Sequence, residues 1–126
     1  IPAIRMAEAQ VEHNDGRTWM YQFDWRSTAF DGRLGSCHAL EIPFVFDALS
    51  AGGAQLFTGD GAPQALSDAM HTAWINFARD GDPGHAGLPA WPAYEPVGRA
   101  TMHFDTTCAV RHDSGAAERA AWDGLI

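Results

Sequence analysis

The sequence predicts a fold that mixes β-strands with α-helices, and three segments lead to this prediction. Thr18 to Trp25 alternates aromatic and polar side chains with the period of two that is typical of a strand. From Pro63 onward, apolar residues recur at the spacing of a helix, whereas Ala100 to Phe104 has the pattern of a short strand. With 126 residues, of which 46% are hydrophobic, the chain is long enough for one domain of ordinary size.

The first half of the chain is predicted to form a helix, a strand and a loop. Pro2 suits the first turn of a helix that continues to Val11 and ends at the turn Asn14 to Gly16. The strand follows from Arg17, and one of its faces is aromatic: Trp19, Tyr21, Phe23 and Trp25. A polar loop, residues 26–37, then leads to His38, and the apolar run Ile42 to Phe46 is expected to return the chain to the core.

The second half is predicted to contain one long helix, a strand and a short terminal helix. Ala48 to Ala62 is glycine-rich and is expected to be a flexible connection. Pro63 starts the long helix, and Gly81 ends it. Its apolar stripe is expected to lie in the core: Leu66, Met70, Ala73, Trp74, Phe77 and Ala78. Ala100 to Phe104 is predicted to be an edge strand, and Ala116 to Trp122 a terminal helix.

The charge of the chain disfavours two classes of partner. Sixteen acidic residues against eight arginines and no lysine give a formal net charge of −8 without a basic patch. Binding to nucleic acid or to an anionic membrane is therefore not expected. The chain shows no signal peptide and no apolar run near the roughly 20 residues that cross a membrane. A cytoplasmic location is favoured, although the true N-terminus is expected to lie upstream of Ile1.

His38 is the most informative residue, because it lies in a loop that opens at Gly35 and closes on an apolar run. An imidazole exchanges protons near neutral pH, so a histidine on a loop anchored at both ends can act as a general base. An ordinary histidine of a surface loop is the alternative that the residues alone leave open.

The surrounding motif resembles the catalytic-histidine region of the type-B carboxylesterases, the cholinesterase and para-nitrobenzyl esterase group of α/β-hydrolases. There, Gly-x-x-His-x-x-Glu precedes a Pro-Phe-Val-Phe-like run, and Gly35, His38 and Glu41 match it ahead of Pro43 to Phe46. Further segments are similar to the family in order and spacing: Tyr21 to Trp25, Leu66 to Met70, Trp74 to Pro83 and Trp91 to Tyr94. The resemblance therefore spans nearly the whole chain.

This resemblance implies an α/β fold, namely the late strands and packing helices of an α/β-hydrolase, incomplete as a standalone domain. Family members carry their nucleophile in a Gly-x-Ser-x-Gly elbow, and their triad follows the order Ser, acid, His. No such elbow occurs here, and only 37 residues precede His38. Residues 1–126 are therefore expected to be the C-terminal piece of one catalytic domain of a serine carboxylesterase, supplying the catalytic histidine and inactive alone. The implied partners are a small carboxylic ester and the rest of the hydrolase chain.

Four residues near His38 are assigned roles. Leu34, Cys37 and Leu40 flank the base and are candidates for contact with the substrate pocket. Glu41 is expected to be a structural anchor bonded to the backbone or to an arginine, because the family's acid precedes the histidine. Cys37 as a nucleophile is the alternative, but neighbouring side chains in an extended loop point apart, which favours a packing role.

The remaining reactive residues indicate no cofactor or metal. Cys37 and Cys108 set no disulfide framework and are both expected to be reduced. The six histidines fall in no recognised ligand spacing, so scattered histidines are favoured over a metal site.

Two other functions stay open at this stage. The first is a noncatalytic binding or scaffold protein that keeps the hydrolase fold after losing its triad. The second is a small interaction module that acts alone. The upstream gene sequence would separate all three functions. An intact elbow supports the enzyme, a replaced serine supports the scaffold, and a stop followed by a new start codon supports the module.

Overall fold

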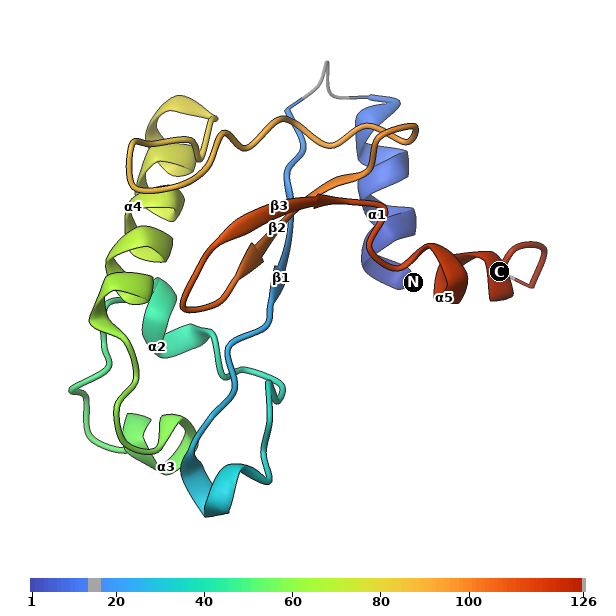
Figure 1. Ribbon diagram of the computed structural model, residues 1–126. Coiled ribbons are helices and arrows are strands. Elements are labelled where there is room, and N and C mark those ends of the chain that lie inside the picture. Colours follow the sequence, from blue (N-terminus) through green and yellow to red (C-terminus); the bar gives the residue numbers. More distant parts are fainter. Residues whose placement is uncertain (14–16, 126) are drawn as a thin grey trace.

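The computed structural model describes residues 1–13 and 17–125 (Figure 1). The turn predicted at Asn14 to Gly16 lies outside the described residues. The elements in chain order are α1 (Pro2–Val11), β1 (Met20–Phe23), the 3₁₀ turn η1 (Ala29–Gly32), α2 (Ile42–Val45), α3 (Ala54–Thr58), α4 (Gln64–Asp80), β2 (Ala100–Phe104), β3 (Ala109–His112) and α5 (Ala116–Ala121). Among these helices, none is long and apolar enough to span a membrane.

The described strands form a three-stranded sheet in the order β1-β2-β3. β1 runs parallel to β2 with Met20 opposite Thr101, and β2 runs antiparallel to β3 with Met102 opposite Val110. The prediction that Ala100–Phe104 is an edge strand is wrong, because β3 covers its second edge. The sequence did not reveal β3, whose four residues include Arg111 and His112 and lack a clear apolar alternation. β1 lies at one edge of the described sheet.

The core lies between the sheet and α4, which covers one side of it while α1 and α5 lie on the other (Figure 1). Its buried residues are Trp25, Leu40, Phe44, Val45, Leu66, Met70, Ala73, Trp91, Met102 and Phe104. The prediction of a buried stripe on α4 is confirmed for Leu66, Met70 and Ala73. It is wrong for the last turns, where Phe77 is 47% exposed and Ala78 is also exposed.

The segment after His38 returns to the core only in part. The apolar run forms α2, in which Phe44 and Val45 are buried but Ile42 and Phe46 remain exposed. A single helical turn has two sides, so only half of the run can face α4. The connection predicted for Ala48 to Ala62 also contains a short helix, α3.

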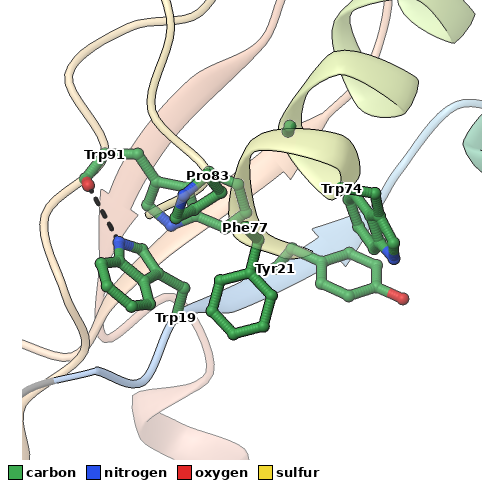
Figure 2. A pocket seen from close by; sticks show the side chains of 7 residues that line it. Trp19, Tyr21, Trp74, Phe77, Pro83 and Trp91 are labelled. Atoms are coloured by element: carbon green, nitrogen blue, oxygen red, sulfur yellow. Dashed lines mark hydrogen bonds between the residues drawn. The ribbon is translucent and has the colours of Figure 1, made fainter. Parts of the chain in front are cut away.

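The alternation predicted an aromatic side for β1, and in the structure Trp19 and Tyr21 pack against α4. The Tyr21 and Trp74 rings meet edge to face at 4.9 Å, and those of Trp19 and Phe77 at 5.8 Å. Together with Ala73, Pro83 and Trp91 they line an aromatic hollow of about 220 Å³ (Figure 2). The Trp19 indole N–H donates to the Trp91 carbonyl at 3.2 Å. This bond holds the loop between α4 and β2 against the start of β1.

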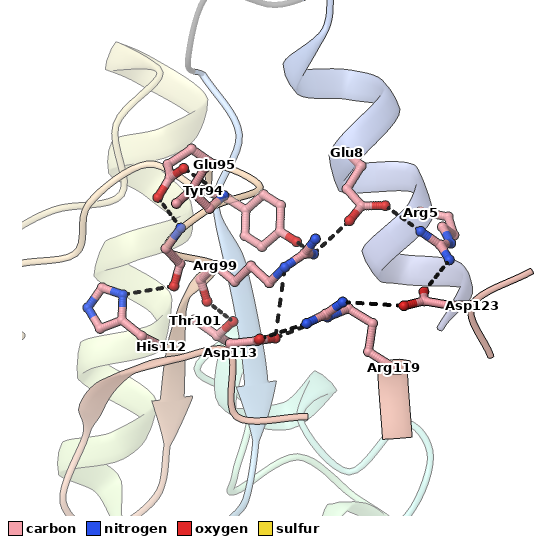
Figure 3. Close-up of polar contacts among 12 residues, drawn as sticks. Arg5, Glu8, Tyr94, Glu95, Arg99, Thr101, His112, Asp113, Arg119 and Asp123 are labelled. Atoms are coloured by element: carbon pink, nitrogen blue, oxygen red, sulfur yellow. Dashed lines mark hydrogen bonds and ion pairs between the residues drawn. The ribbon is translucent and has the colours of Figure 1, made fainter. Parts of the chain in front are cut away.

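A polar network attaches both terminal helices to the same end of the sheet (Figure 3). The Arg99 guanidinium donates to Glu8 at 2.6 Å and to the Tyr94 hydroxyl at 2.8 Å. Arg119 donates to Asp113 at 2.8 Å, and thereby fixes α5 to the end of β3. The hydrogen bond from Arg99 lowers the pKa of Glu8 by more than burial raises it. The pKa of Glu8 therefore lies below its ordinary value.

Candidate active site

The loop that carries His38 is fixed to the end of β1 by the serine two residues before it. The Ser36 hydroxyl donates to the Trp25 carbonyl at 2.6 Å and lies 2.7 Å from that of Asp24. Gly35 has a φ of +57°, a conformation that favours glycine, and its carbonyl accepts the Ser27 N–H at 3.1 Å. The anchoring that the sequence suggested is thus present, and Ser36 provides it.

His38 is exposed and borders an open hollow of about 410 Å³. The other residues that line it are Ala3, Trp19, Met20, Tyr21, Phe23, Ser36, Cys37 and Glu41. Among the described residues, none forms a hydrogen bond with the His38 ring. One wall of the hollow comes from β1 and another from the loop, so a bound group would meet the imidazole beside a partly apolar surface. The exposed His38 ring is therefore placed to accept a proton from a group bound in the hollow.

The structure separates the three residues that were expected to contact substrate. Cys37 lines the hollow and is also packed partly against the core. Leu34 is half-buried and does not line it. Leu40 has no exposed surface and belongs to the core cluster, so the expected contact with substrate is not supported for it. Its burial instead fixes the chain just after His38.

Glu41 lies at the start of α2. Its backbone carbonyl accepts the N–H groups of Phe44 and Val45, both at 3.0 Å. Its carboxylate makes no hydrogen bond or ion pair among the described residues, so the predicted bond to backbone or arginine is absent there. Burial, and then the negative charge of Glu41, raise the pKa of the Tyr21 phenol, which lines the same hollow.

Most other histidines are occupied by hydrogen bonds within the fold. His71 Nδ1 lies 2.8 Å from the Val45 carbonyl and joins α4 to α2, while His85 Nε2 lies 3.0 Å from that of Ala69. His112 Nδ1 lies 2.9 Å from the Gly98 carbonyl. In the described part of the chain no group of three or more His, Cys, Asp or Glu side chains is placed to hold a metal ion. Cys37 and Cys108 form no disulfide within the described residues.

His103 is placed differently from all of these. It is buried, its Nδ1 lies 2.6 Å from Asp24 Oδ2, and its Nε2 lies 3.0 Å from Ser114 Oγ. No local pattern indicates this cluster, because Asp24 and His103 lie 79 positions apart in the chain. Only the pairing of the strands brings the three side chains together.

Comparison with known proteins assigns the chain to a family. The model of the carboxylesterase family matches residues 1–122. The chain belongs to the carboxylesterase family. The para-nitrobenzyl esterase of Bacillus subtilis (strain 168) is 33% identical over 123 residues, which cover 94% of this chain and 24% of that protein. Phenmedipham hydrolase of Pseudarthrobacter oxydans is 40% identical over 77 residues, which cover 59% of this chain and 16% of that protein.

Solved carboxylesterase structures share the fold as well. A carboxylesterase of Geobacillus stearothermophilus superposes with a TM-score of 0.69 at 42% sequence identity, over 82% of this chain and 21% of that one. The predicted fold class is confirmed, since the described sheet and its helices form part of an α/β-hydrolase fold. The chain spans less than a quarter of the length of each of these three proteins.

Proposed function

We propose that residues 1–126 are the C-terminal part of the catalytic domain of a serine carboxylesterase, in which His38 is the general base. The observation that carries the proposal is the position of His38. It is exposed at the rim of a hollow, on a loop fixed to the end of β1, in a chain of the carboxylesterase family. His71, His85 and His112 are instead hydrogen-bonded to backbone carbonyls within the fold.

The remaining groups of the triad would come from the rest of the hydrolase chain. A serine of that part would attack the ester carbonyl, and His38 would take its proton and pass it to the leaving alcohol. A carboxylate from the rest of the hydrolase chain would orient the imidazole. Glu41 is not assigned this role, because it follows the histidine in the sequence and makes no hydrogen bond to it in the described residues. Backbone N–H groups of the same part would hold the oxyanion. This chemistry requires no metal, nucleotide or flavin.

The substrate proposed is a small carboxylic ester, which is the class of molecule indicated by the names of the relatives. Cys37 lines the hollow beside His38, and we assign it to the wall that an acyl or alcohol group would contact. Leu34 and Leu40 do not line this hollow and are left out of the proposed pocket.

A hybrid protein tests the proposal directly. Residues 1–126 would replace the matching segment of the Bacillus subtilis para-nitrobenzyl esterase, which supplies an upstream part from a relative that is 33% identical. The hybrid should hydrolyse para-nitrophenyl esters. His38→Ala should lower its kcat by about 10⁴-fold or more and change KM little, because a general base acts on the transition state.

His13→Ala is the matched control, because His13 is also exposed but does not line the hollow. Its activity should stay close to that of the unchanged hybrid. An active hybrid in which His38→Ala keeps a near-normal kcat would show that the wrong histidine has been assigned. The reaction of the catalytic serine with an organophosphonate should be lost with His38, since a hydroxyl is a weak nucleophile without its base.

A further inference from the structure

We propose that Ser114 is a second nucleophile of this protein, activated by His103 and Asp24 outside the His38 hollow and able to take an acyl group from a small aryl ester. None of these residues lines the hollow that contains His38. The distances match those of a nucleophile and its base, and of a base and the carboxylate that orients it. The inference is independent of the role of His38.

Each member of this cluster lies in, or one or two residues after, a different strand of the sheet. Asp24 directly follows β1, and its N–H donates to the Phe104 carbonyl at 2.8 Å, which continues the pairing with β2. His103 belongs to β2 and lies opposite Gln22 of β1 and Ala109 of β3. Ser114 follows β3 by two residues. Because β2 is central, its histidine can reach a partner on each side.

The ionisation of Asp24 decides which nitrogen of His103 carries the proton. Burial raises the pKa of Asp24, whereas the hydrogen bonds from His103 and Gln22 lower it. The lowering effects together outweigh burial, so the pKa of Asp24 lies below its ordinary value. An ionised carboxylate only accepts hydrogen bonds, so Nδ1 of His103 must donate to it. In the neutral ring Nε2 is then an acceptor, and the Ser114 hydroxyl is left to donate its proton to Nε2 at 3.0 Å.

Burial of the base and exposure of the nucleophile favour reaction at Ser114. His103 is 3% exposed, so water has little access to its ring, whereas Ser114 is exposed to solvent. Asp24 satisfies only Nδ1 of the buried ring, and Nε2 is paired with the Ser114 hydroxyl. The bond from Nε2 to an exposed hydroxyl adds a group that external esters can reach.

The proposed step balances without any further reactant. Ser114 Oγ attacks the carbonyl carbon of the ester and forms a new C–O bond, while its proton moves to His103 Nε2. The tetrahedral intermediate breaks the bond to the aryl oxygen and releases a phenolate, which leaves acyl-Ser114. The imidazolium then returns its proton to the solvent or to the phenolate. An aryl ester is required because its good leaving group lowers a barrier that no assigned oxyanion donor lowers here.

The test is acetylation of the 126-residue chain by para-nitrophenyl acetate, mapped residue by residue by mass spectrometry. The chain contains no lysine, which removes the main competing amines. Ser50 is the internal reference, because it is exposed and forms no hydrogen bond with an imidazole of the described residues. Ser114 should be acetylated at least about 10²-fold faster than Ser50, which is the lower range of assistance by a general base.

Variants distinguish activation from simple exposure. Ser114→Ala should remove the rapid release of one equivalent of phenolate, and Ser50→Ala should leave it unchanged. Asp24→Asn should reduce the rate at Ser114 toward that of Ser50, whereas Asp24→Glu should retain part of it, since a carboxylate is restored. The Asp24→Asn variant should also lose the strongly deshielded Nδ1–H proton resonance of His103.

Equal acetylation rates at Ser114 and Ser50 in the unchanged chain would overturn the proposal, whether or not the Asp24 variants fold. A fast rate at Ser114 that survives Asp24→Asn in a folded variant would also overturn it. In that case exposure alone would explain the reactivity.

Discussion

Leu40→Ala should destabilise the chain strongly, because this side chain anchors the segment just after His38 and has no exposed surface. The substitution removes three carbon atoms from the core cluster, to which Phe44 also belongs. At about 0.8 kcal/mol per buried carbon the lost transfer energy is about 2.4 kcal/mol. The cavity left behind raises the expected loss to about 3–4 kcal/mol, within the range found for buried leucines.

Urea denaturation followed by tryptophan fluorescence and by circular dichroism measures this loss at a fixed protein concentration. Leu56→Ala is the matched control, since Leu56 is 68% exposed. Its free energy of unfolding should change by less than about 0.5 kcal/mol. In thermal unfolding, Leu40→Ala should lower Tm by about 10–15 °C.

Equal losses for Leu40→Ala and Leu56→Ala would refute the placement of Leu40 in the core. A near-neutral Leu40→Ala variant would also reopen its role as a substrate contact, because an exposed leucine can be truncated at little cost.

Three further predictions concern the edge of the sheet, the response to acid and the activity of the chain. The chain should associate and bind a hydrophobic dye, because β1 is an edge strand of the described sheet and Phe77 is 47% exposed beside it. A monomer in sedimentation experiments that binds no dye would contradict this prediction. Because the pKa of Glu8 lies below its ordinary value of 4.5 in the folded chain, its contribution is present above that value and is lost as the pH falls through the folded pKa. Glu8→Gln should therefore lose less stability than the unchanged chain between neutral pH and about pH 3 in urea titrations, and an identical pH dependence would refute the role of Arg99. Beyond the single equivalent of phenolate released by acetylation of Ser114, the chain should not turn over para-nitrophenyl acetate with saturation kinetics. It lacks the Gly-x-Ser-x-Gly nucleophile of its family. Saturable turnover that is unaffected by His38→Ala would contradict this prediction.

Local patterns in the sequence were sufficient for several elements and for the family. The predicted helices near Pro2, Pro63 and Ala116 are confirmed as α1, α4 and α5, because capping residues and apolar spacing act over a few neighbouring residues. The alternation predicted an aromatic side for β1, and the structure shows Trp19 and Tyr21 packed against α4. The motif around His38 indicated the family, which the comparisons confirm. The role of His38 itself stays a prediction.

Only the tertiary structure decided which strand is central, which side chains around His38 are buried, and which polar groups meet across the sheet. Short strands such as β3 gain their stability from pairing with a distant partner, so their own residues carry little signal. Leu40 and Cys37 have similar sequence surroundings, yet one is enclosed by the core and the other faces the hollow. Asp24, His103 and Ser114 become neighbours only through strand register, because their proximity depends on contacts across 79 residues that no local pattern encodes.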